Sequence, residues 1–323
     1  MITSPEIRTV AIGTSLTPLS DEVVTAGLQI ARTAGARIVL VHAFQPPAAY
    51  AAYGGGAPYA PDVLLEETLR AEHEAAEQRL HEQIDRLGIR PEELLSRRIE
   101  YGPPHRVITE AAEKCTADLI VVGATESAGL AKMFGSTADR VVRKATRPVL
   151  MIRGRLELPL RRVLLPVDLS PLSAAAFRYG LALLDRIAPD LAVELEAFYV
   201  MTGFDRGILE PESEPDLSEP EAVRELQRFV ADNSFRARHR VQTRVVHGEI
   251  ADAIRARGEE WDADLLLVGT HGRGGFERFL LGSVAADVMR RGSASVLVVP
   301  VGLEVRESRP LVVQEAAAVL ATA

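Results

Sequence analysis

Short runs of apolar, often β-branched residues alternate along this chain with longer segments in which apolar residues recur every three or four positions. The short runs have the length of buried strands, and the longer segments have the period of amphipathic helices. Strands that alternate with helices form parallel βαβ units, whose helices cover both faces of the sheet. The pattern therefore predicts an α/β fold built on a doubly wound parallel sheet.

The same order of elements occurs twice. An offset of roughly 153 residues aligns residues 17–20 with residues 170–173, which indicates an internal duplication. We expect two tandem five-stranded domains over residues 1–153 and 161–300, followed by a tail over 301–323. The predicted strands of the first copy are 9–14, 37–44, 95–101, 117–123 and 148–152. Those of the second copy are 162–167, 192–200, 241–246, 264–269 and 295–299.

Composition narrows the class of protein. The 323 residues are 47% hydrophobic and 25% charged, as in an ordinary soluble globular protein. A net charge of -8 argues against a general nucleic-acid or anionic-membrane surface, because both are polyanions. The single cysteine, Cys115, excludes an intrachain disulfide, and we interpret it as a small apolar filler. The first residues lack the basic and apolar regions of a secretory signal, so we expect a cytoplasmic protein.

A glycine-rich segment follows the predicted strand 264–269 and leads into a helix-like run. Gly269 and Gly272 lie three residues apart, nine residues intervene, and then Gly282 and Ser283 close the segment. Small residues let backbone N–H groups approach a ligand closely, and a helix that begins near Gly282 adds the positive end of its dipole. The segment therefore favours phosphate, but turns also need glycine for structural reasons, so glycines alone do not decide between the two.

The spacing is more specific than the composition. G-x-x-G, nine residues and G-[ST] after a fourth strand resembles the ATP-binding signature of the universal stress protein family, and it is matched here without a gap. Residues 163–170 resemble the family's first strand, with Asp168 at its carboxyl end, and residues 262–268 and 296–300 resemble its fourth and fifth strands. The resemblance implies two tandem adenine-nucleotide alpha-hydrolase-like domains and ATP as the ligand, and it leaves open whether Mg²⁺ accompanies the nucleotide.

The resemblance places the ATP site in the second copy. The resemblance assigns Asp168 to the adenosine, because a carboxylate could accept hydrogen bonds from the adenine amine or the ribose hydroxyls. The alternative is that Asp168 or Ser170 caps the helix that follows. Arg273 and Arg278 add positive charge near the loop, where charged side chains are otherwise simply solvated. The further residues that the resemblance implies are Pro166, Val167 and Ala197 beside the adenine, Val268 in the fourth strand, and Gly269, His271, Gly272, Gly282, Ser283 and Val284 at the ribose and phosphates.

The first copy departs from the signature. Ser15 stands where Asp168 does, Glu126 lies near the second motif glycine, and the run to Gly135 is one residue shorter, although Gly129 offers another alignment. A carboxylate roughly 4 Å from a phosphate charge costs about 1 kcal/mol in water and about 4 kcal/mol at an effective dielectric of 20. We expect the first copy to bind ATP weakly or not at all.

The fifth predicted strands bear on assembly. Residues 149–152 and 296–299 are apolar, and an unpaired apolar edge promotes association. The resemblance implies antiparallel pairing of these edges. Because both copies lie on one chain, we expect them to pair with each other as a pseudo-twofold unit. A homodimer of whole chains and an unidentified regulatory protein partner are left open.

Three functions are compatible with these residues. The first is an ATP-binding regulatory protein of the universal stress type, with little or no ATP turnover. The second is an enzyme of the adenine-nucleotide alpha-hydrolase group that cleaves ATP or adenylates a substrate, but residues 168–173 lack the glycines of that group's SGGxDS loop, and no Walker loop is present. The third is a scaffold without nucleotide. We identify no catalytic residues in the sequence and leave slow ATP hydrolysis open.

Overall fold

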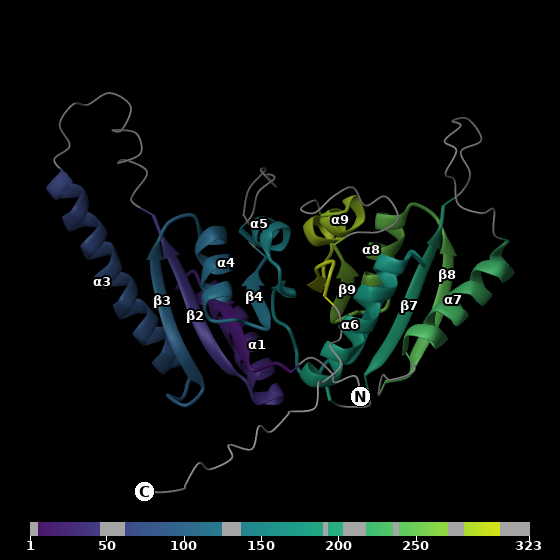
Figure 1. Ribbon diagram of the computed structural model, residues 1–323, viewed down its shortest axis with the longest axis horizontal. Helices are drawn as coiled ribbons and strands as arrows, with labels where there is room; N and C mark the ends of the chain where they lie inside the picture. The colour runs from purple at the N-terminus through teal and green to yellow at the C-terminus, as the bar shows by residue number, and fades with distance from the viewer. Residues whose placement is uncertain are drawn as a thin grey trace, which may run out of the picture.

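The computed structural model describes residues 6–45, 62–124, 137–189, 193–202, 218–234, 239–270 and 281–303. Within these ranges ten strands form one continuous sheet in the order β3-β2-β1-β4-β5-β10-β9-β6-β7-β8 (Figure 1). All neighbouring strands run parallel except β5 and β10, which are antiparallel. The duplicated α/β fold that the pattern predicts is therefore present, with its two halves joined in one sheet.

The elements alternate as the sequence predicts. In the first half they are β1 (Thr9–Gly13), α1 (Pro18–Ala34), β2 (Arg37–Phe44), α3 (Asp62–Arg86), β3 (Leu94–Tyr101), α4 (Pro104–Lys114), β4 (Leu119–Gly123), α5 (Thr137–Lys144) and β5 (Val149–Ile152). In the second half they are β6 (Arg162–Pro166), α6 (Pro171–Ile187), β7 (Glu194–Met201), α7 (Glu219–Ser234), β8 (Val241–His247), α8 (Ile250–Glu260), β9 (Leu265–Gly269), α9 (Ser283–Arg291) and β10 (Ser295–Val299).

Strand boundaries differ little from the predicted ones. The predicted strands 37–44 and 295–299 coincide with β2 and β10, and the others differ at an end by one or two residues. The prediction for β4 begins two residues too early, because Thr116 takes a left-handed turn with φ of 51° and the Ala117 N–H donates to the Ala112 carbonyl at 2.8 Å. The chain is still leaving α4 at that point.

Backbone geometry repeats between the halves. Leu16 and Leu169, each two residues before the first helix of its half, have φ of 57° and 62°. Thr116 and Asp262, each just before the fourth strand, have φ of 51° and 46°. Residues other than glycine seldom take positive φ, so these shared exceptions support the duplication independently of the side chains. They also fix which positions of the two halves correspond.

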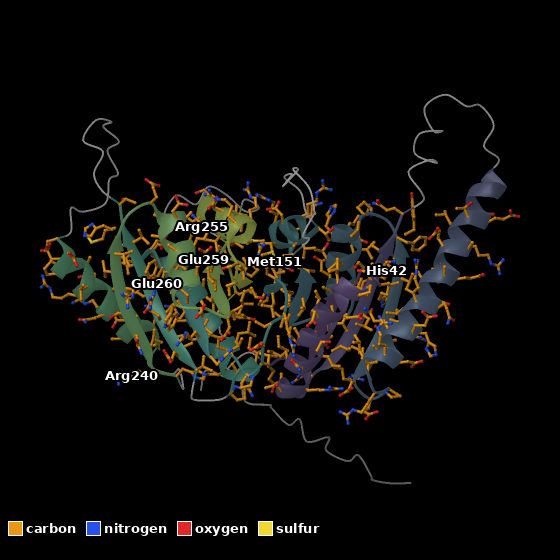
Figure 2. All side chains as sticks on the ribbon, turned by 180° about the vertical axis from the view of Figure 1, so that it is seen from behind. His42, Met151, Arg240, Arg255, Glu259 and Glu260 are labelled. Carbon is orange, nitrogen blue, oxygen red and sulfur yellow. The ribbon has the colours of Figure 1, made fainter. Side chains whose placement is uncertain are left out.

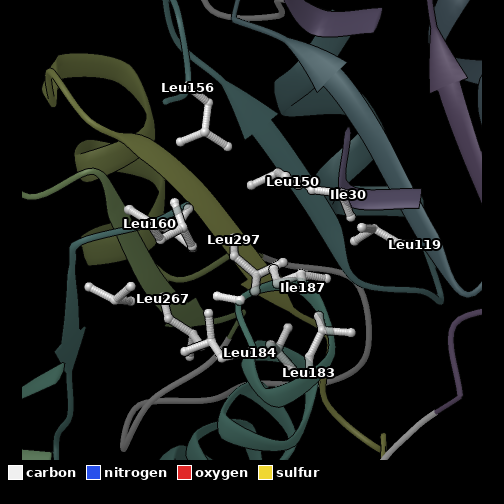
Figure 3. Packing of buried hydrophobic residues seen from close by; sticks show 14 of the residues in the cluster. Ile30, Leu119, Leu150, Leu156, Leu160, Leu183, Leu184, Ile187, Leu267 and Leu297 are labelled. Atoms are coloured by element: carbon white, nitrogen blue, oxygen red, sulfur yellow. The ribbon is translucent and has the colours of Figure 1, made fainter. Parts of the chain in front are cut away.

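Helices cover both faces of the sheet. One apolar core packs α1, α3, α6 and α7 on one face, and the other packs α4, α5, α8 and α9 on the opposite face. Each core contains residues of both halves, and α1 contacts α6 across the middle of the molecule. Figure 3 shows Leu150 of β5 and Leu297 of β10 within one packed cluster, with Leu184 and Ile187 of α6 beside them. The halves therefore share their cores.

The two fifth strands make the seam, as expected from their apolar edges. Val296 lies opposite Met151, and Leu297 lies opposite Leu150 in the antiparallel ladder. These side chains are buried, and Met151 lies at the centre of the molecule (Figure 2). None of the described helices is long and apolar enough to cross a membrane.

Candidate functional site

The strand order of the second half reverses between β6 and β9. Their ladder joins Val163 to Leu265 and Leu164 to Leu266, and both strands then continue to their carboxyl ends. Ligands of open α/β sheets bind beyond such a reversal. A small cleft lies there, lined by Leu165, Pro166, Val167, Ser173, Ala176, Phe177, Leu267 and Gly269. It brings together three of the predicted site residues: Pro166, Val167 and Gly269.

Asp168 lies in the turn that follows β6. Its Oδ1 accepts a hydrogen bond from the Ser170 N–H at 2.9 Å, and its own N–H donates to the Ser173 Oγ at 3.3 Å. Ser170 is the N-cap of α6, and its Oγ accepts from the Ser173 N–H at 3.1 Å. Of the two residues that could cap this helix, Ser170 therefore makes the cap. Asp168 therefore holds this turn, and its carboxylate lies just beyond the carboxyl end of β6.

The two ends of the glycine-rich segment are held together. The Gly282 N–H donates to the Thr270 carbonyl at 2.7 Å, so the end of β9 and the start of α9 meet. Two further hydrogen bonds hold Thr270 in place. Its N–H donates to the Val299 carbonyl and its Oγ1 accepts from the Val301 N–H, both at 3.1 Å. The sequence prediction missed Thr270, whose part in the site is a backbone contact without a motif of its own.

The start of α9 suits an anion. Gly282 is its N-cap with φ of -55° and ψ of 150°, glycine has no side chain of its own to cap the helix, and the first turn has no acidic residue. The first N–H groups of a helix have no partner within the helix, and they carry the positive end of its dipole. Ser283 is exposed and Val284 is half-buried there. The predicted residues His271, Gly272 and Arg273, and also Arg278, lie outside the described residues.

Two predicted residues lie deeper than the cleft. Ala197 is fully buried in β7, level with Leu165 of β6, and Val268 is buried in β9 one residue before Gly269. Neither is among the residues that line the cleft. Their assignment to the ligand therefore stays a prediction.

The equivalent point of the first half is filled by its own side chains. The Thr14 Oγ1 lies 3.0 Å from the Ser20 Oγ and 2.9 Å from the Gln83 Oε1. The Gln83 Nε2 donates to the Asp21 Oδ1 at 2.7 Å, and Arg86 donates to both oxygens of that carboxylate, at 2.9 and 3.0 Å. Gln83 is fully buried. We call this network of Thr14, Ser20, Asp21, Gln83 and Arg86 the Gln83 network.

The Gln83 network also shifts a pKa. Burial works to raise the pKa of Asp21, but hydrogen bonds from Arg86 and Gln83 outweigh it, so the pKa lies below its ordinary value. Ser15, the counterpart of Asp168, is exposed, and its Oγ lies 2.8 Å from the Thr17 Oγ1. In strand register, the buried Leu40 takes the place of Ala197. At the end of its first strand, the first half thus differs from the second half in the charge, the hydrogen bonds and the volume of its side chains.

The described residues offer little for other chemistry. They contain no cluster of three histidine, cysteine or acidic side chains that could hold a metal ion. Cys115 is half-buried, and burial raises the pKa of its thiol, which fits a structural thiol better than a reactive one.

Comparison with known proteins gives one family for both halves. The model of the universal stress protein family matches residues 6–153 and 159–300. A universal stress protein of Mycolicibacterium smegmatis is 28% identical over 312 residues, which cover 93% of this chain and 99% of that protein. One from Thermus aquaticus is 34% identical over 124 residues, which cover 38% of this chain and 82% of that protein.

Solved structures agree at the level of the fold. A universal stress protein from Archaeoglobus fulgidus has a TM-score of 0.60 at 18% identity and covers 90% of this chain and 98% of its own. A functionally unknown protein from Pseudomonas aeruginosa has a TM-score of 0.61 at 17% identity, with 91% and 93% covered. Because the family model covers almost the whole chain in two successive matches, the protein belongs to the universal stress protein family and carries two such domains in tandem.

Proposed function

We propose that this protein binds one ATP in its second half and acts in regulation of the stress response through nucleotide-dependent contacts, with little or no ATP turnover. The observation that carries the proposal is the hydrogen bond of 2.7 Å from the Gly282 N–H to the Thr270 carbonyl. It brings the uncapped start of α9 to the end of β9, beside the cleft at the point where strand order reverses. A triphosphate at α9 would leave the adenosine to the carboxyl end of β6, beside Asp168.

Little turnover is expected because binding alone does not activate water. Efficient attack on a phosphate needs a positioned general base or a metal-activated water. The turn that holds Asp168 occupies its Oδ1 with the Ser170 N–H, which favours a positioning role over proton transfer. We expect a rate far below the roughly 10 per second that is typical of enzymes.

The test is titration calorimetry with ATP, followed by measurement of the ADP, AMP and pyrophosphate released. The critical variant is Gly282→Leu, because φ of -55° suits any residue at this position while the added side chain would crowd the phosphates. Gly135→Leu is the matched change in the first half. We expect one site per chain, lost in Gly282→Leu and kept in Gly135→Leu.

Other outcomes would change the proposal in distinct ways. Two equivalent sites would contradict the assignment to the second half alone. No binding at all would favour the scaffold without nucleotide. Rapid release of AMP would favour an enzyme of the adenine-nucleotide alpha-hydrolase group.

A further inference from the structure

A groove lies at the outer edge of the first half, between α3 and β3. Its volume of about 540 Å³ is within the range of ligand-binding clefts. β3 ends the sheet, and Figure 1 shows α3 leaning away from it toward the outside of the molecule. The lining residues are His73, Glu77 and Leu80 from α3, and Arg97, Arg98, Ile99 and Glu100 from β3. We call it the α3–β3 groove.

The lining shows that this groove reaches the backbone of the strand. Side chains of successive strand residues point to opposite faces, yet four successive residues of β3 line the groove. The groove must therefore pass along the open edge of β3. The Gly102 N–H donates to the Phe44 carbonyl of β2 at 3.1 Å, so by alternation the N–H groups of Tyr101, Ile99 and Arg97 point away from β2.

The walls carry opposite charges that do not meet. Glu77 on α3 and Arg97 on β3 both line the groove and are exposed, and neither takes part in an ion pair among the described residues. The half-buried Ile99 supplies apolar surface on the strand wall, whereas Leu80 of α3 is only 1% exposed. Strand register places Arg97 and Ile99 on the same face as the buried Leu40, which belongs to the core that α3 covers.

The second half lacks this arrangement of side chains. In register, Thr243 of β8 takes the place of Arg97 on the opposite edge of the sheet. A cation at this register position thus distinguishes the first half. Exposed strand edges bind extended peptides by main-chain hydrogen bonds, while side-chain pockets on alternate residues select the sequence.

We propose that the α3–β3 groove binds an extended segment of a partner protein, which adds a strand to β3. The segment carries an acidic side chain that pairs with Arg97 and, two residues away on the same face, an apolar side chain that packs on Ile99. Charge complementarity selects this occupant, since Arg97 is an exposed cation on the open strand itself, whereas the Glu77 carboxylate lies across the groove on α3. The proposal does not depend on ATP binding in the second half.

Hydrogen exchange tests the added strand directly. The probe is a fluorescein-labelled decapeptide of β-branched residues that carries one aspartate with an isoleucine two positions away. When it binds the full chain, the amides of Arg97, Ile99 and Tyr101 should gain protection, whereas those of Arg98 and Glu100, which point toward β2, should not change. Binding without this alternating protection would contradict strand addition.

A charge exchange tests the side-chain contact. Arg97→Glu should weaken the aspartate peptide about fivefold, as expected for one partly exposed ion pair, and should bind a peptide with lysine in place of the aspartate better than wild type does. Thr243→Glu, the matched change on the other edge, should alter neither affinity. A variant that merely damages the fold would lose both peptides.

Three results would overturn the proposal. The first is that Thr243→Glu weakens binding of the aspartate peptide as much as Arg97→Glu does, which would mean that net charge alone governs binding. The second is a single-stranded oligonucleotide that binds more tightly than the peptide. The third is a dimer in sedimentation velocity that disappears in Arg97→Glu, because the groove would then belong to a second copy of this chain.

Discussion

The two halves of this protein have the same backbone order but use the carboxyl ends of their first strands differently. In the second half, Val167 and Ser173 line a cleft and Asp168 lies beside it. In the first half, the counterparts of Val167 and Ser173 are Thr14 and Ser20, which are buried and hydrogen-bonded in the Gln83 network. The comparison teaches that a duplicated fold can keep its backbone geometry while one copy uses the end of its first strand for contacts within the chain and the other leaves a small cleft there.

On the other face of the sheet, it is the second half that carries buried hydrogen-bonded polar side chains, and the first half that has apolar ones at the corresponding positions. There the second half buries a charged pair, in which the Arg257 guanidinium donates to both Glu196 oxygens at 2.8 and 2.9 Å. The corresponding residues of the first half are Val39 and Ala111, both fully buried and apolar. The half with the open cleft therefore carries the buried charges, and the half with the filled cleft carries an apolar core at those positions.

Breaking the buried pair should give the largest effect. Arg257→Ala leaves Glu196, which is 3% exposed, with only the Arg244 guanidinium at 3.2 Å. Removing one partner of a buried pair costs about 3 to 5 kcal/mol, and because Arg244 keeps one contact with Glu196, the free energy of unfolding should fall by about 3 kcal/mol, the lower end of that range. Urea unfolding followed by fluorescence of Trp261, the single tryptophan, would measure it in the second half.

The control copies the first half. The double variant Glu196→Val with Arg257→Ala installs the residue types of Val39 and Ala111. Replacing a buried pair by apolar residues is often neutral or stabilising, so most of the lost stability should return. A double variant no more stable than Arg257→Ala would mean that the two cores are not interchangeable at these positions.

The next prediction concerns the turns after the first strands. Asp168→Ala should weaken ATP binding by about 1.5 to 3 kcal/mol, the range for hydrogen bonds to a charged group, whereas Ser15→Ala should change it very little. Titration calorimetry on both variants measures the difference between the halves. Equal effects of the two substitutions would remove the functional distinction between these turns.

A third prediction concerns the removal of the Gln83 side chain from the Gln83 network. Gln83→Ala leaves buried Thr14 and Ser20 hydroxyls and part of the Asp21 carboxylate without their partner, which should cost about 1 to 3 kcal/mol of stability. ATP stoichiometry should stay at one, since the larger Leu40 still stands where the second half has Ala197, and Ser15 still stands where it has Asp168. A second ATP site in Gln83→Ala would show that Gln83 alone excludes the nucleotide.

Much of the fold was predictable because its information is local. Strand positions follow from apolar runs such as residues 37–44 and 295–299, and the seam follows from two apolar fifth strands. The Gln83 network was not predictable, because Gln83 comes from a charged helix 69 residues beyond Thr14, and no local pattern shows that it turns inward. Glu196, within an apolar strand, likewise finds its partner Arg257 61 residues away.

The candidate site divides in the same way. Glycine spacing and Asp168 are sequence features, and their resemblance to the family's signature led to the prediction that the second half is the site of ATP binding. Thr270 was missed because its contribution is its carbonyl, which every residue has. The groove beside β3 was missed because it depends on how far α3 stands from the sheet edge, a property of packing and not of either segment alone.

The smallest expected effect is a pH dependence confined to the first half. His42 is buried, with its Nδ1 2.9 Å from the Thr14 carbonyl, and its counterpart in the second half is Tyr199. Burial lowers the pKa of His42 below the ordinary 6.5, against the opposing effect of the Thr14 carbonyl. Above pH 6.5 the side chain is neutral in both the folded and unfolded states, so it contributes no dependence there.

Below pH 6.5 the unfolded chain binds the proton first, so the stability due to His42 falls with pH until the folded protein is protonated too. The loss is about 1.4 kcal/mol for each unit by which the two pKa values differ. His42→Gln should therefore flatten the curve of unfolding free energy against pH below 6.5. His105, whose pKa is also lowered, contributes equally to the curves of the wild type and the variant. Parallel curves for wild type and variant would mean that the pKa of His42 does not differ between the folded and unfolded states.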